Sequence, residues 1–366
     1  MADAQVAATP QGALPPLHDE WLRALTGISH PASEPKATCG DCVMCAGVER
    51  SGSRVTFSPT IKCCSYVPHL ANFLAGRSLR GPGADSVRAR IARRTGVTPL
   101  GVGLSHADVL HMVGAQAHFG RAAVVRCPHF VAETQGCAIW ATRNAVCSTW
   151  FCKHERGAVG QRFWHAVRDL LIAAEERVAY RCLVEDDRLP QEQVDDVLGH
   201  RAQVRATIAA AQAETPVPQP RPASLPDEEP GWYERMWGGW AGREEEWYLR
   251  CADSVDGMDD AELASWMDGV RRLVEAVQAR SAEVEAVDVP QNPTFAPGIG
   301  SEATVDVLRL IGYSPFDPLV LPAELQSSLR ALDGRPLEEV QAALEASGGV
   351  RLDDDLLVSL ADFGLV

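Results

Sequence analysis

The sequence lacks the segments that would place it in or across a membrane. It contains no apolar run of roughly 18 residues, the length that a membrane-spanning helix needs. Its N-terminal segment, MADAQVAATPQGALPPLHDE, has neither the basic region nor the apolar core of a signal peptide. These absences predict a cytoplasmic protein in a reducing compartment, without a membrane partner.

Positive charge is also scarce. The chain has 34 basic and 49 acidic residues, which gives a net charge of −15 at pH 7. An acidic surface repels phosphate backbones and anionic lipids. The basic run RIARR at residues 90–94 is short and typical of a solvated helix face. We therefore expect no nucleic-acid partner.

Familiar catalytic motifs are missing too. The glycines of GVGLSHADV lack the Lys-Ser/Thr of a Walker loop and the third glycine of a dinucleotide fingerprint. Neither G-x-S-x-G nor H-E-x-x-H occurs, and the C-x3-C-x2-C motif of radical-SAM enzymes is absent. The sequence therefore assigns no catalytic residue and leaves open whether the protein is an enzyme.

Cysteine, by contrast, is dense between residues 39 and 152, where nine of the 11 cysteines lie. In a reducing compartment such density indicates metal or redox chemistry rather than disulfides. The isolated Cys182 and Cys251 are typical of small buried apolar side chains. The candidate metal ligands are Cys39, Cys42, Cys45, Cys63, Cys64, Cys127, Cys137, Cys147 and Cys152.

The first three of these cysteines have the spacing C-x2-C-x2-C, in the stretch TCGDCVMC. A C-x2-C turn presents two sulfurs to one ion or cluster at little entropic cost. The spacing also matches the start of the bacterial ferredoxin run, whose fourth cysteine precedes a proline. Position 49 is Glu here, but a remote Cys127-Pro128 and the pair Cys63-Cys64 are available. The fold is expected to bring the missing ligand to the triplet.

The identity of the metal stays open between an iron–sulfur cluster and zinc. Zinc favours closed tetrahedral sites of four cysteines, or of three cysteines and a histidine such as His129 or His154. All-thiolate ligation and the ferredoxin-like triplet favour an iron–sulfur cluster. Nine thiols suit two four-ligand centres with one to spare. Each histidine on its own is more typical of a structural or exposed position.

The stretch from Cys127 to Cys152 resembles the cysteine-cluster family described as zinc- or iron-chelating and often called YkgJ-like. That family shows a C-P-[FH]-L-like start, then G-x-C-x-I-[YW], then R-P-x-x-C-R-x-F-P-C. The matching residues are Cys127, Pro128 and His129 at the start, Cys137, Ile139 and Trp140 in the middle, and Arg143, Cys147 and Cys152 at the end.

The resemblance has departures. Gly136 directly precedes its cysteine, Asn144 replaces the usual proline, and Ser148 replaces an arginine. The family's N-terminal half is usually C-x2-C-x2-CC, whereas here the doublet comes 18 residues after Cys45. The resemblance covers about residues 37–157 and implies a metal-chelating domain. A flagellin lysine N-methylase carries a similar cluster, which keeps an enzymatic role open.

The rest of the chain divides by composition. We expect a disordered tail over residues 1–35, a cysteine-cluster metal-binding domain over 36–157, and a helical region over 158–287 with a Pro-rich linker at 215–230. Within the helical region, apolar residues at helical spacing predict one long helix. The predicted fold class is α+β, mostly helical, with an irregular cysteine domain. The residues of that apolar face are Phe163, Val167, Leu170, Leu171 and Ala174.

Residues 301–366 form the last expected unit. Leu325, Leu329 and Leu332 mark one helix that ends at Asp333-Gly334, and Pro336 starts the next. A third helix follows the turn at Gly348-Gly349. The pattern resembles a PqqD-like or winged-helix unit, which implies binding of a leader or substrate peptide along a strand edge.

The function predicted from these features is that of a metal-binding accessory or adaptor protein acting on a peptide or protein partner. One alternative is a protein- or peptide-modifying enzyme, lysine N-methylase-like or redox, that uses the cluster. The other is a metal-handling or sensing protein without catalysis, in which metal ligation drives folding.

Overall fold

The computed structural model describes residues 14–105, 108–109, 118–185, 188–212 and 231–366. It is a mixed α+β structure, 53% helical and 8% strand, which confirms the predicted fold class. In the described part of the chain, no helix is long and apolar enough to cross a membrane. The expected Pro-rich linker and the first residues of the expected tail lie outside the described residues.

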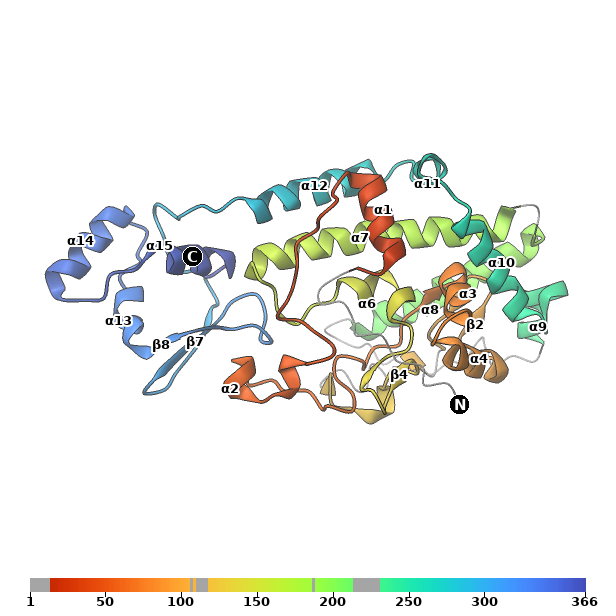
Figure 1. Ribbon diagram of the computed structural model, residues 1–366, viewed down its shortest axis with the longest axis horizontal. Coiled ribbons are helices and arrows are strands. Elements are labelled where there is room, and N and C mark those ends of the chain that lie inside the picture. Colours follow the sequence, from red (N-terminus) through yellow and green to blue (C-terminus); the bar gives the residue numbers. More distant parts are fainter. Residues whose placement is uncertain (1–13, 106–107, 110–117, 186–187, 213–230) are drawn as a thin grey trace.

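The elements fall into two groups along the chain (Figure 1). The N-terminal body contains α1 (Pro16–Thr26), α2 (Val48–Ser51), β1 (Leu70–Ala71), α3 (Asn72–Leu79), α4 (Ala84–Arg93), β2 (Val97–Thr98), β3 (Gly101–Val102), β4 (Phe130–Val131), β5 (Gly136–Cys137), α6 (Ala145–Thr149), α7 (Gly157–Val184), α8 (Gln191–Gln212), α9 (Trp232–Trp237), α10 (Glu244–Asp256), α11 (Asp260–Trp266) and α12 (Arg271–Glu285). The C-terminal unit contains β6 (Gly300–Ala303), β7 (Val307–Ile311), β8 (Leu319–Pro322), α13 (Gln326–Leu329), α14 (Leu337–Ser347) and α15 (Asp354–Asp362).

Helix α1 corrects the expectation of a disordered tail over residues 1–35. Its side chains Leu17, Trp21 and Leu22 are buried in the main core, and Trp21 packs on Phe73 with ring centroids 5.6 Å apart. Pro16 stands in its first turn, where a missing N–H costs nothing. The tail composition that suggested disorder is outweighed by this apolar face, which finds its partners far along the chain.

The long helix α7 organises the body. Its predicted apolar face is buried, with Phe163, Val167, Leu170 and Leu171 each at most 1% exposed. Helix α12 runs along it, and α6, α3 and α10 also pack on it. The aromatic residues of α9 and α10 fill the same core. Trp237, Trp247 and Tyr248 are fully buried, which agrees with a packing role for this aromatic series.

Gly76 shows how closely α3 and α10 approach. A Cβ atom at this position would lie 1.9 Å from the carbonyl oxygen of Tyr248. The Tyr248 hydroxyl donates to the Thr98 carbonyl at 2.7 Å, and Trp247 Nε1 donates to the Pro99 carbonyl at 2.9 Å. These two bonds satisfy the polar ends of buried rings and hold the loop between β2 and β3 against α10.

The C-terminal unit has a core of its own. Strands β6, β7 and β8 form an antiparallel sheet with β7 in the centre, so that Leu308 pairs with Ala303 and Leu321. Helices α13, α14 and α15 follow the predicted leucine pattern. The unit begins earlier than the predicted residue 301, because Val289 and Phe295 pack against its core. Its fully buried side chains include Val340, Leu357, Leu360 and Leu365.

Polar contacts join the C-terminal unit to residues 39–154, here called the cysteine segment. Lys153 Nζ lies 3.1 Å from Asp317 Oδ1, and both side chains are at most 8% exposed. The other Asp317 oxygen accepts from the His154 amide at 3.1 Å. Ser53 Oγ donates to the Pro315 carbonyl at 2.7 Å, and Arg309 Nε donates to the Gly52 carbonyl at 3.0 Å. A buried ion pair therefore lies directly next to a candidate ligand, Cys152.

Candidate metal centre

Six of the nine candidate cysteines line one cavity of about 200 Å³, here called the large thiol cavity. Apolar side chains, among them Ile139, Val146 and Trp150, complete much of its wall. Residues separated by more than a hundred positions in the chain thus surround the same space. The cysteines of this cavity are Cys39, Cys63, Cys64, Cys127, Cys137 and Cys147.

A second cavity of about 40 Å³, the small thiol cavity, adjoins the first. Cys42 and Cys152 line only this one, and Cys127 and Cys147 line only the large one. Eight of the nine predicted ligands thus reach the two cavities. The ninth, Cys45, does not line either, but its thiol is hydrogen-bonded to that of Cys42. The cysteines common to both cavities are Cys39, Cys63, Cys64 and Cys137.

Short local structures hold these cysteines in place. The first triplet ends in a 3₁₀ turn, in which the Cys45 amide donates to the Cys42 carbonyl at 3.0 Å. The Cys127 amide donates to the Cys64 carbonyl at 2.7 Å. This bond joins the vicinal pair to the Cys-Pro motif. In this way Cys127, a remote candidate for the ligand that the triplet lacks, reaches the large thiol cavity, which Cys39 of the triplet also lines.

The last two motif cysteines depend on strand and cap geometry. Cys137 lies in β5, paired with Phe130 of β4. Cys147 lies in the first turn of α6, where its amide donates to the Asn144 side-chain oxygen at 3.1 Å. Asn144 is therefore the N-cap of α6, a role that proline cannot fill with a side-chain acceptor. This explains one departure from the YkgJ-like pattern.

Two cations stand beside the thiols. Lys62 is 4% exposed, and its Nζ donates to the carbonyls of Cys39 and Gln135, each at 2.6 Å. Arg143 lines the large thiol cavity, and its guanidinium lies 4.9 Å from the centre of the Trp140 ring. Burial raises the pKa of the Cys137 and Cys147 thiols, and the charge of Arg143 offsets only part of this rise.

Burial works in the opposite direction and prevails. It raises the pKa of Cys127 to about 12 and that of Cys137 to about 11. The hydrogen bond that the Cys63 thiol makes to Cys64, followed by burial, raises the pKa of Cys63 well above its ordinary value. Thiols in such surroundings stay protonated at neutral pH unless a cation replaces the proton. Metal binding here must therefore release protons.

The sulfurs surround space and do not converge on a point. Among the residues that the structure describes, no three His, Cys, Asp or Glu side chains are arranged to hold one metal ion as they stand. All eleven cysteines are free thiols. The gathering of cysteines predicted from the sequence is present, while the ligand set of any one centre is not fixed by these positions.

The two histidines near the motif belong to other networks. His129 is 1% exposed, and its Nδ1 is hydrogen-bonded to Ser86 Oγ at 2.8 Å. His154 Nδ1 faces the Tyr313 hydroxyl at 3.3 Å. Neither lines a thiol cavity. Cys182 and Cys251, both fully buried in the main core, behave as the expected small apolar side chains.

Sequence reasoning missed the aromatic wall beside the thiols. Phe57 lines the small cavity, Phe119 the large one and Trp150 both. Phe57 and Phe119 each lie with ring centroids 5.6–6.1 Å from Phe316 of the C-terminal unit. The substitution of Trp-Phe for the family's Phe-Pro at residues 150–151 was the one available signal, because it adds a large ring at the cluster.

Comparison with known proteins adds no relative. No protein-family model matches the chain, and no significant match is found among curated proteins or solved structures. The YkgJ-like and PqqD-like resemblances therefore rest on the residues quoted above and stay predictions.

Proposed function

We propose that the chain binds a metal centre in each of its two thiol cavities, with an iron–sulfur cluster in the large one, and serves as an accessory or adaptor for a peptide or protein partner. The observation that carries the proposal is that eight cysteines, from segments 39–42, 63–64, 127–137 and 147–152, line two adjoining cavities. Thiolates are the ligands that iron–sulfur clusters and zinc both take from proteins. An iron–sulfur cluster supplies one-electron redox chemistry when bound.

The two cavities support a division of ligands. Cys127 and Cys147 belong to the centre in the large cavity, and Cys42 and Cys152 belong to the centre in the small one. The four cysteines common to both cavities provide two further ligands to each. Cys45 is then the spare ninth thiol, adjacent to Cys42.

The volume of the large thiol cavity supports an iron–sulfur cluster rather than a zinc ion. A zinc ion holds its sulfurs about 2.3 Å away, so a closed zinc site leaves no void between them. A cavity of about 200 Å³ instead suits an inorganic cluster of several atoms. Lys62 and Arg143 supply positive charge beside the thiolates, which offsets part of the negative charge that such a centre would carry.

The C-terminal unit supports a peptide or protein partner. Its sheet has β7 in the centre, with β6 and β8 as the edge strands. Extended peptides bind by adding a strand to such an edge. The unit also lies against the cysteine segment through Asp317 and Phe316, so a partner on it would be close to the proposed centres. The net charge of −15 disfavours nucleic acid in that role.

The test is anaerobic purification followed by an absorption spectrum and analysis for iron, zinc and sulfide. We expect a brown protein with iron and sulfide in equal amounts. Changing Cys39, Cys42, Cys127, Cys137, Cys147 or Cys152 to Ala should each lower the metal content. The variants at residues that line both cavities, Cys39, Cys63 and Cys137, should lower it most.

Matched controls are available in the buried thiols of the main core. Cys182→Ala and Cys251→Ala remove cysteines that are fully buried and line neither cavity, so they should leave the metal content unchanged. Retention of full metal content in all the cavity variants would show that the site assignment is wrong. If the elemental analysis finds zinc and no sulfide, the centres are zinc sites and not iron–sulfur clusters.

A further inference from the structure

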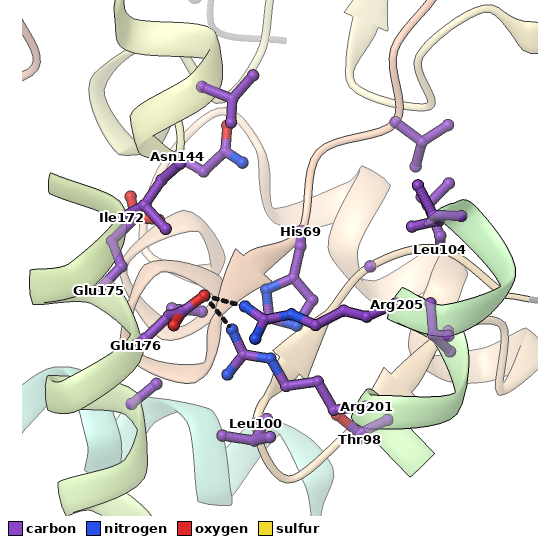
Figure 2. A pocket seen from close by; sticks show the side chains of 18 of the residues that line it. His69, Thr98, Leu100, Leu104, Asn144, Ile172, Glu175, Glu176, Arg201 and Arg205 are labelled. Carbon is purple, nitrogen blue, oxygen red and sulfur yellow. Dashed lines mark hydrogen bonds and ion pairs between the residues drawn. The ribbon is translucent and has the colours of Figure 1, made fainter. Parts of the chain in front are cut away.

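A third cavity, of about 220 Å³, lies between α7 and α8 and is here called the arginine pocket (Figure 2). It is larger than the cavity of about 150 Å³ that admits benzene in another protein. Much of its wall is aliphatic. The side chains that form this apolar part include Val67, Leu100, Ile172, Val197, Val204 and Ile208.

The charged part of the wall is unbalanced. Arg201 and Arg205, one turn apart on α8, both reach the same oxygen of Glu176 on α7, with Arg201 Nη2 at 2.8 Å (Figure 2). Two guanidinium groups thus share one carboxylate. The neighbouring Glu175 offsets this only in part. Its charge also attracts Arg201, but burial raises its pKa, and its Oε1 accepts from the Ala145 amide at 2.6 Å and lies 3.0 Å from His18 Nε2.

His69 adds a polar group without adding charge. Its ring lies beside the two guanidinium groups (Figure 2). Burial, together with the charges of Arg201 and Arg205, lowers the pKa of His69 to about 3. The imidazole is therefore neutral at physiological pH, and it does not compete with the arginines for an anion.

From this arrangement we infer that the arginine pocket binds a small organic acid, with its carboxylate on Arg201 and Arg205 and its apolar body against the aliphatic wall. The planar guanidinium fork matches a carboxylate in two parallel hydrogen bonds. Phosphate fits less well, because its second negative charge would lie beside Glu176. A neutral molecule of the same shape would leave the surplus positive charge without a partner.

The arginine pocket borders the large thiol cavity. Tyr66 and Val146 line both the arginine pocket and the large thiol cavity. A bound acid would lie one layer of side chains away from the thiols. The inference goes beyond the proposed function and holds whether or not a metal is bound, because the arginines and their carboxylate are independent of the cysteines.

The experiment is isothermal titration of the full chain with straight-chain acids of increasing length, from butanoate to octanoate. We expect one saturable site, with at least tenfold weaker binding of hexanamide and of inorganic phosphate than of hexanoate. Arg205→Gln and Arg201→Gln should each weaken hexanoate binding at least tenfold. The matched control Arg271→Gln, which removes an exposed arginine paired with Glu275 elsewhere, should leave it unchanged.

Glu176→Gln gives the result that a merely structural role would not. It removes the competing carboxylate while keeping the side chain's size, so hexanoate should bind severalfold more tightly. Absence of saturable binding by every acid, equal binding of hexanamide or phosphate, or unchanged binding in a folded Arg205→Gln variant would each overturn the inference. Metal content should be the same in all these variants, so failure here is separate from failure of the proposed centres.

Discussion

In the C-terminal unit the buried side chains are almost all leucines, and they pack on one another in a core of their own. In the cysteine segment the strands are two residues long, and the thiols line open space instead. The first region holds itself together by apolar packing. Around the thiols, the second region has the donors for metal ligation in place of such packing, whereas its stretch 70–102 belongs to the main apolar core.

Metal removal should give the largest difference in stability between the C-terminal unit and the cysteine segment. Structural metal sites contribute on the order of 10 kcal/mol to the folding of the segments that they hold. Chelation should therefore remove amide protection over residues 39–64 and 127–152 in hydrogen exchange, while the amides of β7, α14 and α15 keep theirs. Equal loss of amide protection in both regions, or loss in neither, would show that metal does not hold the cysteine segment specifically.

The ion pair between the regions should give the next largest effect. Asp317→Asn leaves the Lys153 ammonium buried without its counter-charge, which costs about 3–5 kcal/mol. Urea denaturation should show this loss. Glu275→Gln, which breaks an exposed pair, should change the unfolding free energy by only about 0.5 kcal/mol. A similar small value for Asp317→Asn would mean that the two regions are not joined through this contact.

Leu357→Ala tests the apolar core of the C-terminal unit. Leu357 is fully buried, so its truncation should cost about 2–5 kcal/mol of unfolding free energy. The metal content should not change, because no thiol lies in this core. Val350→Ala, at a side chain 44% exposed, serves as the control and should change the unfolding free energy by about 0.5 kcal/mol or less. Metal loss in Leu357→Ala would contradict the independence of the two regions.

Glu34 provides a smaller, pH-dependent effect at the edge of the cysteine segment. Its carboxylate accepts from Trp164 Nε1 at 2.9 Å, and burial raises its pKa to about 7. The folded state thus binds a proton that the unfolded state releases above about pH 4.5, so stability falls as pH rises between these values. The loss is roughly 3 kcal/mol at most.

Glu34→Gln should remove this component. A comparison of unfolding free energies at pH 5 and pH 8 measures it, since the wild-type chain should lose more stability over that interval than the variant does. Parallel pH profiles for the two proteins would show that Glu34 carries no such linkage.

The sequence was sufficient for elements whose signal is local. Leucine spacing predicted the helices of the C-terminal unit, and the apolar period predicted α7. It failed for α1, whose burial depends on contacts such as His18 with Glu175, 157 residues away. Cysteine spacing likewise predicted the gathering of thiols. Their division between two cavities, and the approach of Lys62 to Cys39 and Gln135, arise only from the folded path of the chain.

The most direct test of the metal centres is X-ray absorption at the metal edge of anaerobically purified protein. We predict sulfur atoms as the nearest neighbours of the metal, with further iron atoms close by if the centres are clusters. A metal surrounded by nitrogen or oxygen, or a compact metal-free protein in which all nine thiols of residues 39–152 remain, would contradict the assignment.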